Sequence, residues 1–310
     1  MVNNNNISTI ISALSNNKEA VSGEKLAEKL GISRVAVWKK ISKLQNEGYK
    51  IESGRNGYKL VESTDKPYPW ELKNEANNVE YYNSLDSTMK KASQLLNYDC
   101  KNGTVIIAGS QSNGSTVLGG NWISPEGGLY LSRIRTIPFP SIYAALYCTA
   151  SAYACSKILK SEFSIASQIS WPGRLYCDGK KIGGVLTEYK GQGNVIQAIS
   201  SGIGLNIHKS DNLPEDAISI EEAAGRQISI KEVTAALLEE LKKYDKEFYS
   251  EKLLKSYNLN ILEINKNVTV VRDKKYSGVI KKLSESGFLI LEMENKKTIY
   301  INSGDKIIYE

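Results

Sequence analysis

The chain has 310 residues and a net charge of +6, and its length suggests about two domains with room for a small third. With 41% hydrophobic and 24% charged residues, the composition is that of a globular protein. It has a single histidine, His208, and four cysteines that form no Cys-x-x-Cys pair, Cys100, Cys148, Cys155 and Cys177. These counts argue against a zinc site and against histidine-based catalysis, and we expect no metal.

Targeting and membrane segments are not expected. Residues 1–6 lack the charged segment followed by an apolar run that is typical of a signal peptide. No apolar stretch approaches the roughly 20 residues of a membrane-spanning helix. These features predict a cytoplasmic protein with no membrane partner and with reduced cysteines.

Three amphipathic helices are predicted at the start of the chain. The first lies within residues 7–14, whose apolar side chains recur at the i, i+3, i+4, i+7 spacing. The second is capped by Ser22 and ends at Gly31, and the third is capped by Ser33 and ends at Gly48. We expect the apolar face of the third helix to consist of Val35, Ala36, Val37, Ile41 and Leu44.

Two short strands, residues 49–52 and 58–61, are predicted to form a hairpin, so residues 1–63 should be a winged helix-turn-helix domain. Such a domain places its recognition helix in the major groove of double-stranded DNA. The third helix is also basic, which suits phosphate contacts. A solvated basic face, or a winged helix that binds only proteins, is the alternative. The expected DNA-binding residues are Ser33, Arg34, Trp38, Lys39, Lys40 and, at the wing tip, Arg55.

The remainder of the chain is predicted to hold a linker and two more domains. Residues 64–78 contain two prolines and should be a linker with little core of its own. Strands and helices alternate over residues 79–262, which predicts an α/β domain, and short strands in residues 263–310 predict a small β-barrel or sandwich. The expected elements of the α/β domain are strands at 104–108, 129–134, 185–189 and 195–199 and helices at 142–159 and 231–249.

Five segments carry a further signal, namely 33–40, 85–88, 121–125, 179–186 and 202–206. In this order they resemble the bifunctional biotin protein ligase/biotin operon repressor family (BirA type). The resemblance implies an α+β multidomain chain with a winged helix-turn-helix, a class II synthetase-like α/β ligase domain and a C-terminal SH3-like β-barrel. Members of the family make biotinyl-AMP from biotin and ATP, transfer biotin to a carrier-protein lysine, and bind operator DNA as homodimers.

The same resemblance implies a biotin site. Ser87 and Thr88 would bond the ureido group, Trp122 would pack over the ligand, and Lys181 would contact the carboxylate and the adenylate phosphate as the one candidate catalytic residue. Each residue also has a plainer explanation: an N-cap for Ser87 and Thr88, a solvated turn for Lys181, and core packing for Trp122 and for Trp171. The further expected ligand contacts are Gln111, Gly114, Ser115 and Gly184.

Two motifs of the family are altered. Its arginine-rich loop Gly-Arg-Gly-Arg-Arg-Gly reads Gly114-Ser115-Thr116-Val117-Leu118-Gly119 here, without any arginine. Its Lys-Trp-Pro-Asn-Asp motif reads Ser170-Trp171-Pro172-Gly173-Arg174. Loss of one preorganised donor commonly slows a reaction about 10²–10³-fold. An arginine in place of the aspartate would repel Mg²⁺, which prefers oxygen ligands, but Arg174 could pair with a ligand carboxylate or phosphate.

These patterns favour a pseudoenzyme, that is, a repressor that binds biotin or a related small acid without making the adenylate, so that ATP and Mg²⁺ are not expected. The second hypothesis is an active bifunctional biotin ligase and repressor, in which Arg174, Lys180 and Lys181 contact the phosphate. Only this hypothesis requires a biotin carboxyl-carrier protein as a partner. A third hypothesis is that the neutral loop has changed the ligand altogether.

Overall fold

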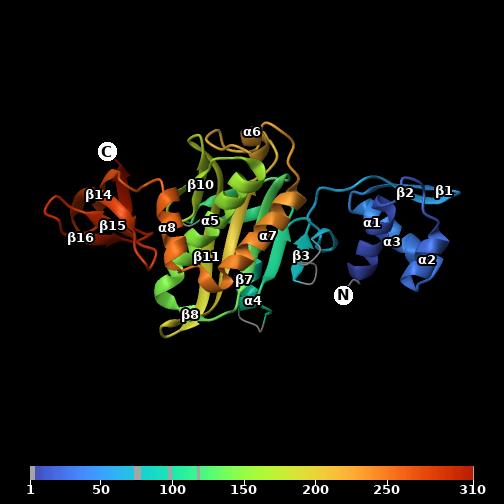
Figure 1. The fold of residues 1–310 in the computed structure, drawn as a ribbon, viewed down its shortest axis with the longest axis horizontal. Helices are drawn as coiled ribbons and strands as arrows, with labels where there is room; N and C mark the ends of the chain where they lie inside the picture. The colour runs from blue at the N-terminus through green and yellow to red at the C-terminus, as the bar shows by residue number, and fades with distance from the viewer. Residues whose placement is uncertain (1–3, 73–77, 97–99, 117–118, 310) are drawn as a thin grey trace. The chain divides into compact units, whose positions relative to one another are not determined.

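The computed structural model describes residues 4–72, 78–96, 100–116 and 119–309. The chain divides into two compact units, Met1–Asn77 and Asn78–Glu310, which are described separately (Figure 1). Within the described residues, no helix is long and apolar enough to cross a membrane.

The first unit has three helices and a two-stranded hairpin. The hydroxyls of Ser22 and Ser33 accept hydrogen bonds from the backbone N–H groups of Lys25 and Ala36, which starts α2 and α3 as predicted. Gly31 ends α2 in the left-handed conformation. The elements are α1 (Asn4–Ser15), α2 (Gly23–Leu30), α3 (Arg34–Asn46), β1 (Lys50–Gly54) and β2 (Gly57–Glu62).

The core of this unit corrects one prediction. Val37, Ile41 and Leu44 of α3 are buried, as their spacing predicts, and so are Ile10 of α1 and Leu26 of α2. Val35, which was expected on the same apolar face, is 61% exposed. Because successive helix positions turn by about 100°, Val35 lies away from the face that Val37 occupies.

Part of the expected linker is folded. Tyr68, Trp70 and Leu72 are buried, and the rings of Tyr68 and Trp70 stack at 4.7 Å. The indole of Trp70 donates to the hydroxyl of Tyr49 at 2.8 Å, which ties the short helix η1 (Pro69–Glu71) to the first unit. Part of the segment predicted to be a linker with little core is therefore packed and buried. Residues 73–77 of the expected linker lie outside the described residues.

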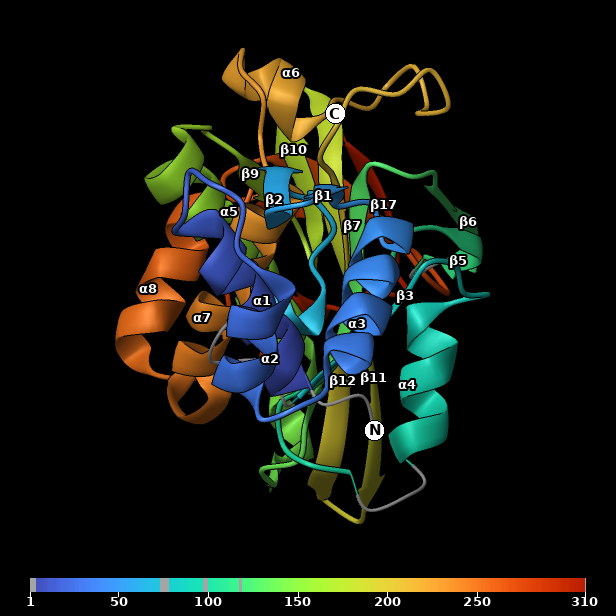
Figure 2. The same cartoon turned by 90° about the vertical axis from the view of Figure 1, so that its right-hand side faces the viewer.

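A mixed, largely antiparallel sheet forms the centre of the second unit (Figure 2). Its order is β3-β4-β7-β12-β11-β10-β9, and only β3 and β4 pair in parallel along this path. The strands are β3 (Val79–Tyr82), β4 (Thr104–Ala108), β7 (Gly128–Arg135), β9 (Gln168–Ser170), β10 (Arg174–Cys177), β11 (Lys180–Gln192) and β12 (Val195–Asn206), with β8 (Phe139–Pro140) beside β12.

Helices cover both faces of this sheet. On β12, Ser201 bonds to Ser151 of α5 at 3.0 Å, whereas a Cβ at the next residue, Gly202, would meet Met89 of α4. Because neighbouring strand residues point to opposite faces, α4 and α5 lie on opposite sides. The helices are α4 (Thr88–Leu96), α5 (Ala144–Phe163), α6 (Ile220–Ala224), α7 (Ile230–Glu247) and α8 (Glu251–Asn260).

The C-terminal strands form a five-stranded antiparallel sheet of order β16-β15-β14-β13-β17. The described strands pair as an open sheet, so the SH3-like barrel stays a prediction. Glu263, which is 2% exposed, joins this region to the central sheet by accepting bonds from the Ser170 hydroxyl and the Trp171 backbone N–H. The strands are β13 (Asn267–Val271), β14 (Lys275–Leu283), β15 (Leu289–Glu292), β16 (Thr298–Ile301) and β17 (Lys306–Tyr309).

Candidate ligand pocket and DNA-binding surface

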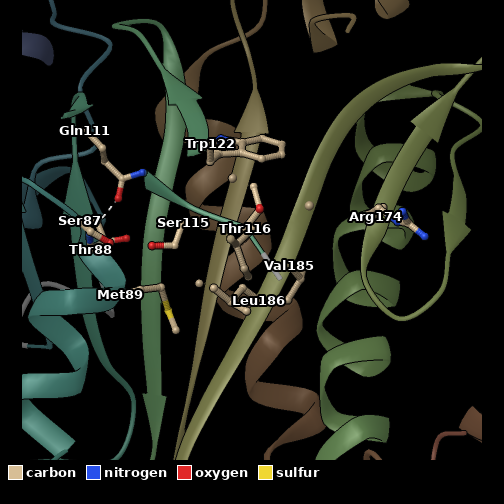
Figure 3. Close-up of a pocket in the computed structure, with 14 residues that line it drawn as sticks. Ser87, Thr88, Met89, Gln111, Ser115, Thr116, Trp122, Arg174, Val185 and Leu186 are labelled. Atoms are coloured by element: carbon tan, nitrogen blue, oxygen red, sulfur yellow. Dashed lines mark hydrogen bonds between the residues drawn. The ribbon is translucent and has the colours of Figure 1, made fainter. Parts of the chain in front are cut away.

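A pocket opens over β11 and β12, beside the start of α4 and the small hairpin of β5 (Gln111–Ser115) and β6 (Asn121–Ser124) (Figure 3). It brings together seven predicted site residues from five separate parts of the sequence: Ser87, Thr88, Gln111, Ser115, Trp122, Arg174 and Gly184. The predicted residues did not include Met89, Thr116, Val185, Leu186, Gly202, Ile203 and Gly204, which complete the lining.

One end of the pocket is polar and neutral. Ser87 and Thr88 are buried, and the backbone N–H of Thr88 donates to the side-chain oxygen of Gln111 at 2.8 Å. The Gln111 amide donates to Ser124 at 3.0 Å, and the Ser132 hydroxyl donates to Thr88 at 2.9 Å. These bonds fix the rotamers, so the hydroxyls are held in place before a ligand arrives.

Ser87 also has the plainer role considered for it. Its hydroxyl accepts the backbone N–H of Lys90 at 3.3 Å, as an N-cap does. The same residue lines the pocket, so its capping role leaves the predicted ligand contact possible in the same place. A helix N-terminus beside the pocket also suits a polar ligand group.

A pair of glycines lies beneath Trp122. Gly184 and Gly204 are register partners on β11 and β12, and Cβ atoms on them would lie 3.4 Å and 2.6 Å from the indole ring. The ring therefore lies directly on the bare backbone of the two strands. The indole N–H is buried and has no hydrogen-bond partner among the described residues. Gly114 does not line the pocket, but a Cβ there would meet the Trp122 carbonyl at 2.6 Å, so it lets β5 and β6 approach closely.

The other end of the pocket is cationic. Arg174 lines it on the opposite side of Trp122 from Ser87 and Thr88 (Figure 3). Lys181 is not a lining residue, but its ammonium lies 4.6 Å from the centre of the Trp122 ring. Burial, and then the charge of Arg174, lower the pKa of Lys181. The two cations therefore lie on this side of the pocket, although the Arg174 guanidinium points away from Trp122 (Figure 3).

Of the two altered motifs, the loop brings no charge to the pocket and the second motif brings only Arg174. From the segment that matches the family's arginine-rich loop, Ser115 and Thr116 line the pocket. Val117 and Leu118 of the same segment lie outside the described residues. In the second motif, Trp171 is buried and its indole donates to the Gly287 carbonyl at 2.9 Å, so it has the core role.

The residues of these motifs do not fit Mg²⁺. Arg174 carries a positive charge where the family motif has a carboxylate, and hard cations require oxygen ligands. Among the described residues, no three acidic, histidine or cysteine side chains lie together as a metal site. The absence of metal from the molecule as a whole stays a prediction.

Three of the expected DNA-binding residues, Arg34, Trp38 and Arg55, share one surface of the first unit. Ser33, the N-cap of α3, is exposed, as are Arg34, Trp38 and Lys39 of the helix; Lys40 is half-buried, and Arg55 is exposed at the hairpin turn. A concave surface between α3 and the hairpin includes Arg34, Trp38 and Arg55. Val35 lines it too, although its apolar character had placed it among the core predictions.

Three family models match consecutive parts of the chain. They are an HTH domain over residues 6–59, the biotin/lipoate A/B protein ligase family over residues 81–206, and the biotin protein ligase C terminal domain over residues 264–306.

Individual proteins match across these parts. The chain is 31% identical over 302 residues to the bifunctional ligase/repressor BirA of Bacillus spizizenii, a match that covers 91% of this chain and 92% of that protein. It is 33% identical over 223 residues to BirA of Bacillus subtilis, covering 68% and 69%. A structure of the biotin protein ligase of Aquifex aeolicus with biotin and ATP is 26% identical with a TM-score of 0.62, covering 75% of this chain and 99% of that one.

Proposed function

The chain belongs to the BirA-type biotin protein ligase/repressor family, and from this membership we propose that it is a biotin-gated transcriptional repressor whose ligase activity is lost or weak. In this proposal the first unit binds a double-stranded DNA operator as part of a homodimer. The second unit binds biotin or a related small acid, and this binding changes the DNA affinity of the first unit.

The distribution of polar groups along the pocket carries the ligand proposal. Ser87, Thr88 and Gln111 offer neutral hydrogen bonds at one end, and Arg174 and Lys181 offer positive charge at the other. A ligand with a neutral polar head, an apolar body and an acidic tail suits this order. Biotin has these parts in its ureido group, its fused rings with their alkyl chain, and its carboxylate.

The altered motifs carry the proposal of lost ligase activity. Adenylation builds charge on a phosphoryl group, and fixed cationic donors stabilise that charge. The loop that has three arginines in the family has none here, and Ser170, in the place of the family's lysine, is bonded to the buried Glu263. If each lost donor slows the reaction about 10²–10³-fold, the loss of several leaves little turnover, although such effects are not additive.

Calorimetry and a labelling assay on the full chain test the two parts of this proposal. We expect heat on adding biotin without ATP, and no labelling of a biotin carboxyl-carrier domain when biotin and ATP are both present. Thr88→Val, which removes a pocket hydroxyl while keeping the shape, should weaken biotin binding. Robust labelling would contradict the loss of ligase activity, and the absence of heat at high biotin would point to a changed ligand.

The second candidate is an active bifunctional ligase and repressor. Arg174 favours it, because this residue lines the pocket and its guanidinium could contact a phosphate by turning toward Trp122, near which Lys181 lies. This candidate predicts pyrophosphate release that depends on biotin and ATP and that is lost in Arg174→Met. A carrier protein would then be a partner as well.

A further inference from the structure

The recognition helix presents two large apolar side chains to solvent. Val35 is 61% exposed and Trp38 is 57% exposed, and their spacing of three residues places them on one face of α3. The face of the helix that packs in the core is a different one, with Val37, Ile41 and Leu44. Exposure of this much apolar surface on the solvent side of the helix points to a contact made outside the unit.

The surface around these side chains has a fixed shape. Val21 pairs with Tyr58 through two backbone hydrogen bonds of 2.8 and 2.9 Å, which join the hairpin to the segment before α2. Gly57 adopts a φ of +118°, and a Cβ there would lie 2.1 Å from the Val21 carbonyl. The wing is therefore held against α2, and the surface between the wing and α3 is preformed.

The charge of this surface identifies the kind of partner. Arg34 and Arg55 line it with Val35 and Trp38, and Glu24 is its one acidic lining residue among those described. Exposed apolar side chains accompanied by two arginines suit the DNA major groove, whose edges are phosphate. Within that groove the exposed apolar group is the C5-methyl of thymine.

We propose that Val35 and Trp38 are specificity-determining residues that contact thymine methyl groups, so that each operator half-site has thymines facing α3. This inference rests on the proposed DNA-binding function. Lys39, beside Trp38 and exposed, holds the phosphate backbone and carries no sequence preference.

The experiment removes single methyl groups from the DNA. Sites are selected from a random duplex library with the full chain, with and without biotin, and each thymine is then replaced by deoxyuridine, which pairs identically but lacks the methyl. We expect roughly fourfold weaker binding at one or two positions of each half-site, the effect of one buried methyl group. Val35→Ala should abolish the penalty at one such position and Trp38→Ala at another.

Two control variants distinguish the proposed methyl contacts from DNA binding in general. Val61→Ala removes another exposed apolar side chain of the same unit, outside the concave surface, and should leave every deoxyuridine penalty unchanged. Lys39→Ala should weaken binding to all duplexes equally and reduce its salt dependence.

Selective DNA binding without any deoxyuridine penalty, or with equal penalties in all variants, would overturn the methyl contact and leave DNA binding intact. Binding to no duplex under either condition would overturn both. A Trp38→Ala variant that changes only the oligomeric state would assign the surface to a second copy of the chain.

Discussion

At the scale of single residues, Gly204 determines where Trp122 can lie. A Cβ on Gly204 would stand 2.6 Å from the indole nitrogen and 2.7 Å from the adjacent ring carbon, so Gly204→Ala must push the ring away from the strands. We expect this variant to bind biotin roughly tenfold more weakly or worse, in line with the 1–3 kcal/mol that overpacking costs. Calorimetry measures the change. Gly304→Ala, where a Cβ has open space, is the matched control, and equal affinities in both variants would contradict the packing argument.

The charge of Lys181 predicts a pH dependence. Burial and Arg174 lower the pKa of Lys181, while a bound carboxylate would favour its protonated form. Biotin affinity should therefore be constant below that lowered pKa and fall as pH rises through it. Arg174→Met removes one cause of the lowering, so the alkaline loss of affinity should move to higher pH although overall affinity decreases. Titrations from neutral to alkaline pH measure this, and a profile that is identical in Lys181→Met would exclude Lys181 as its source.

The stability of the unliganded protein should also depend on the protonation of Lys181. Unlike biotin affinity, stability should rise as the pH rises. A lysine whose pKa is lowered on folding destabilises the folded state while it is charged in both states. This penalty disappears as pH rises from the folded pKa toward the unfolded value. Wild-type protein should therefore gain stability relative to Lys181→Met over that alkaline range, as measured by denaturant unfolding.

The neutral end of the pocket could be predicted from the sequence, because Ser87, Thr88 and Gln111 lie in recognisable segments and all three line the pocket. The glycine pair beneath Trp122 could not, because it depends on the register between β11 and β12. The prediction of Val35 in the core rests on its apolar character alone, although the helical period already separates it from Val37, and the structure shows it exposed.

At the scale of elements, Glu263 holds the C-terminal strands against β9 and the turn that follows it. Its buried carboxylate accepts from Ser170 at 2.7 Å and from the Trp171 backbone at 3.0 Å. Glu263→Ala leaves both donors without this partner, so we expect a loss of about 1–3 kcal/mol for each unsatisfied group. Denaturant unfolding measures the loss. The exposed Glu285, changed to Ala, is the control, and equal stability of the two variants would contradict this role.

Helices with clear caps could be predicted closely, because the capping hydroxyls of Ser22 and Ser33 act over three residues. The order of the strands could not be predicted, since β12 pairs with β7 across more than sixty residues of chain. The strands of the β11–β12 hairpin also extend well beyond the short runs expected at 185–189 and 195–199, because glycines at 183, 184, 202 and 204 interrupt the apolar pattern without ending the strands.

At the scale of the whole molecule, a DNA-binding unit and a ligand-binding unit can act as a switch only if the ligand favours one state of the protein. In the proposed function this ligand is biotin, or a related small acid, without ATP. The adenylate is not needed in this proposal, because Arg174 lines the pocket and Lys181 lies by Trp122, where they could attract a carboxylate, while the loop that contacts the phosphate in the family is neutral here.

This arrangement predicts how DNA affinity responds to each small molecule. Biotin should change the Kd for operator DNA by a factor of roughly 5–150, the range of typical allosteric coupling, and operator DNA should change the Kd for biotin by the same factor. ATP should add nothing to the effect of biotin, because no adenylate forms. Restoring the loop by Ser115→Arg, Val117→Arg and Leu118→Arg together with Arg174→Asp should make the response ATP-dependent and release pyrophosphate. DNA-binding titrations with biotin, with ATP and with both measure these responses, and an ATP-dependent response in the wild-type chain would establish that it still makes the adenylate.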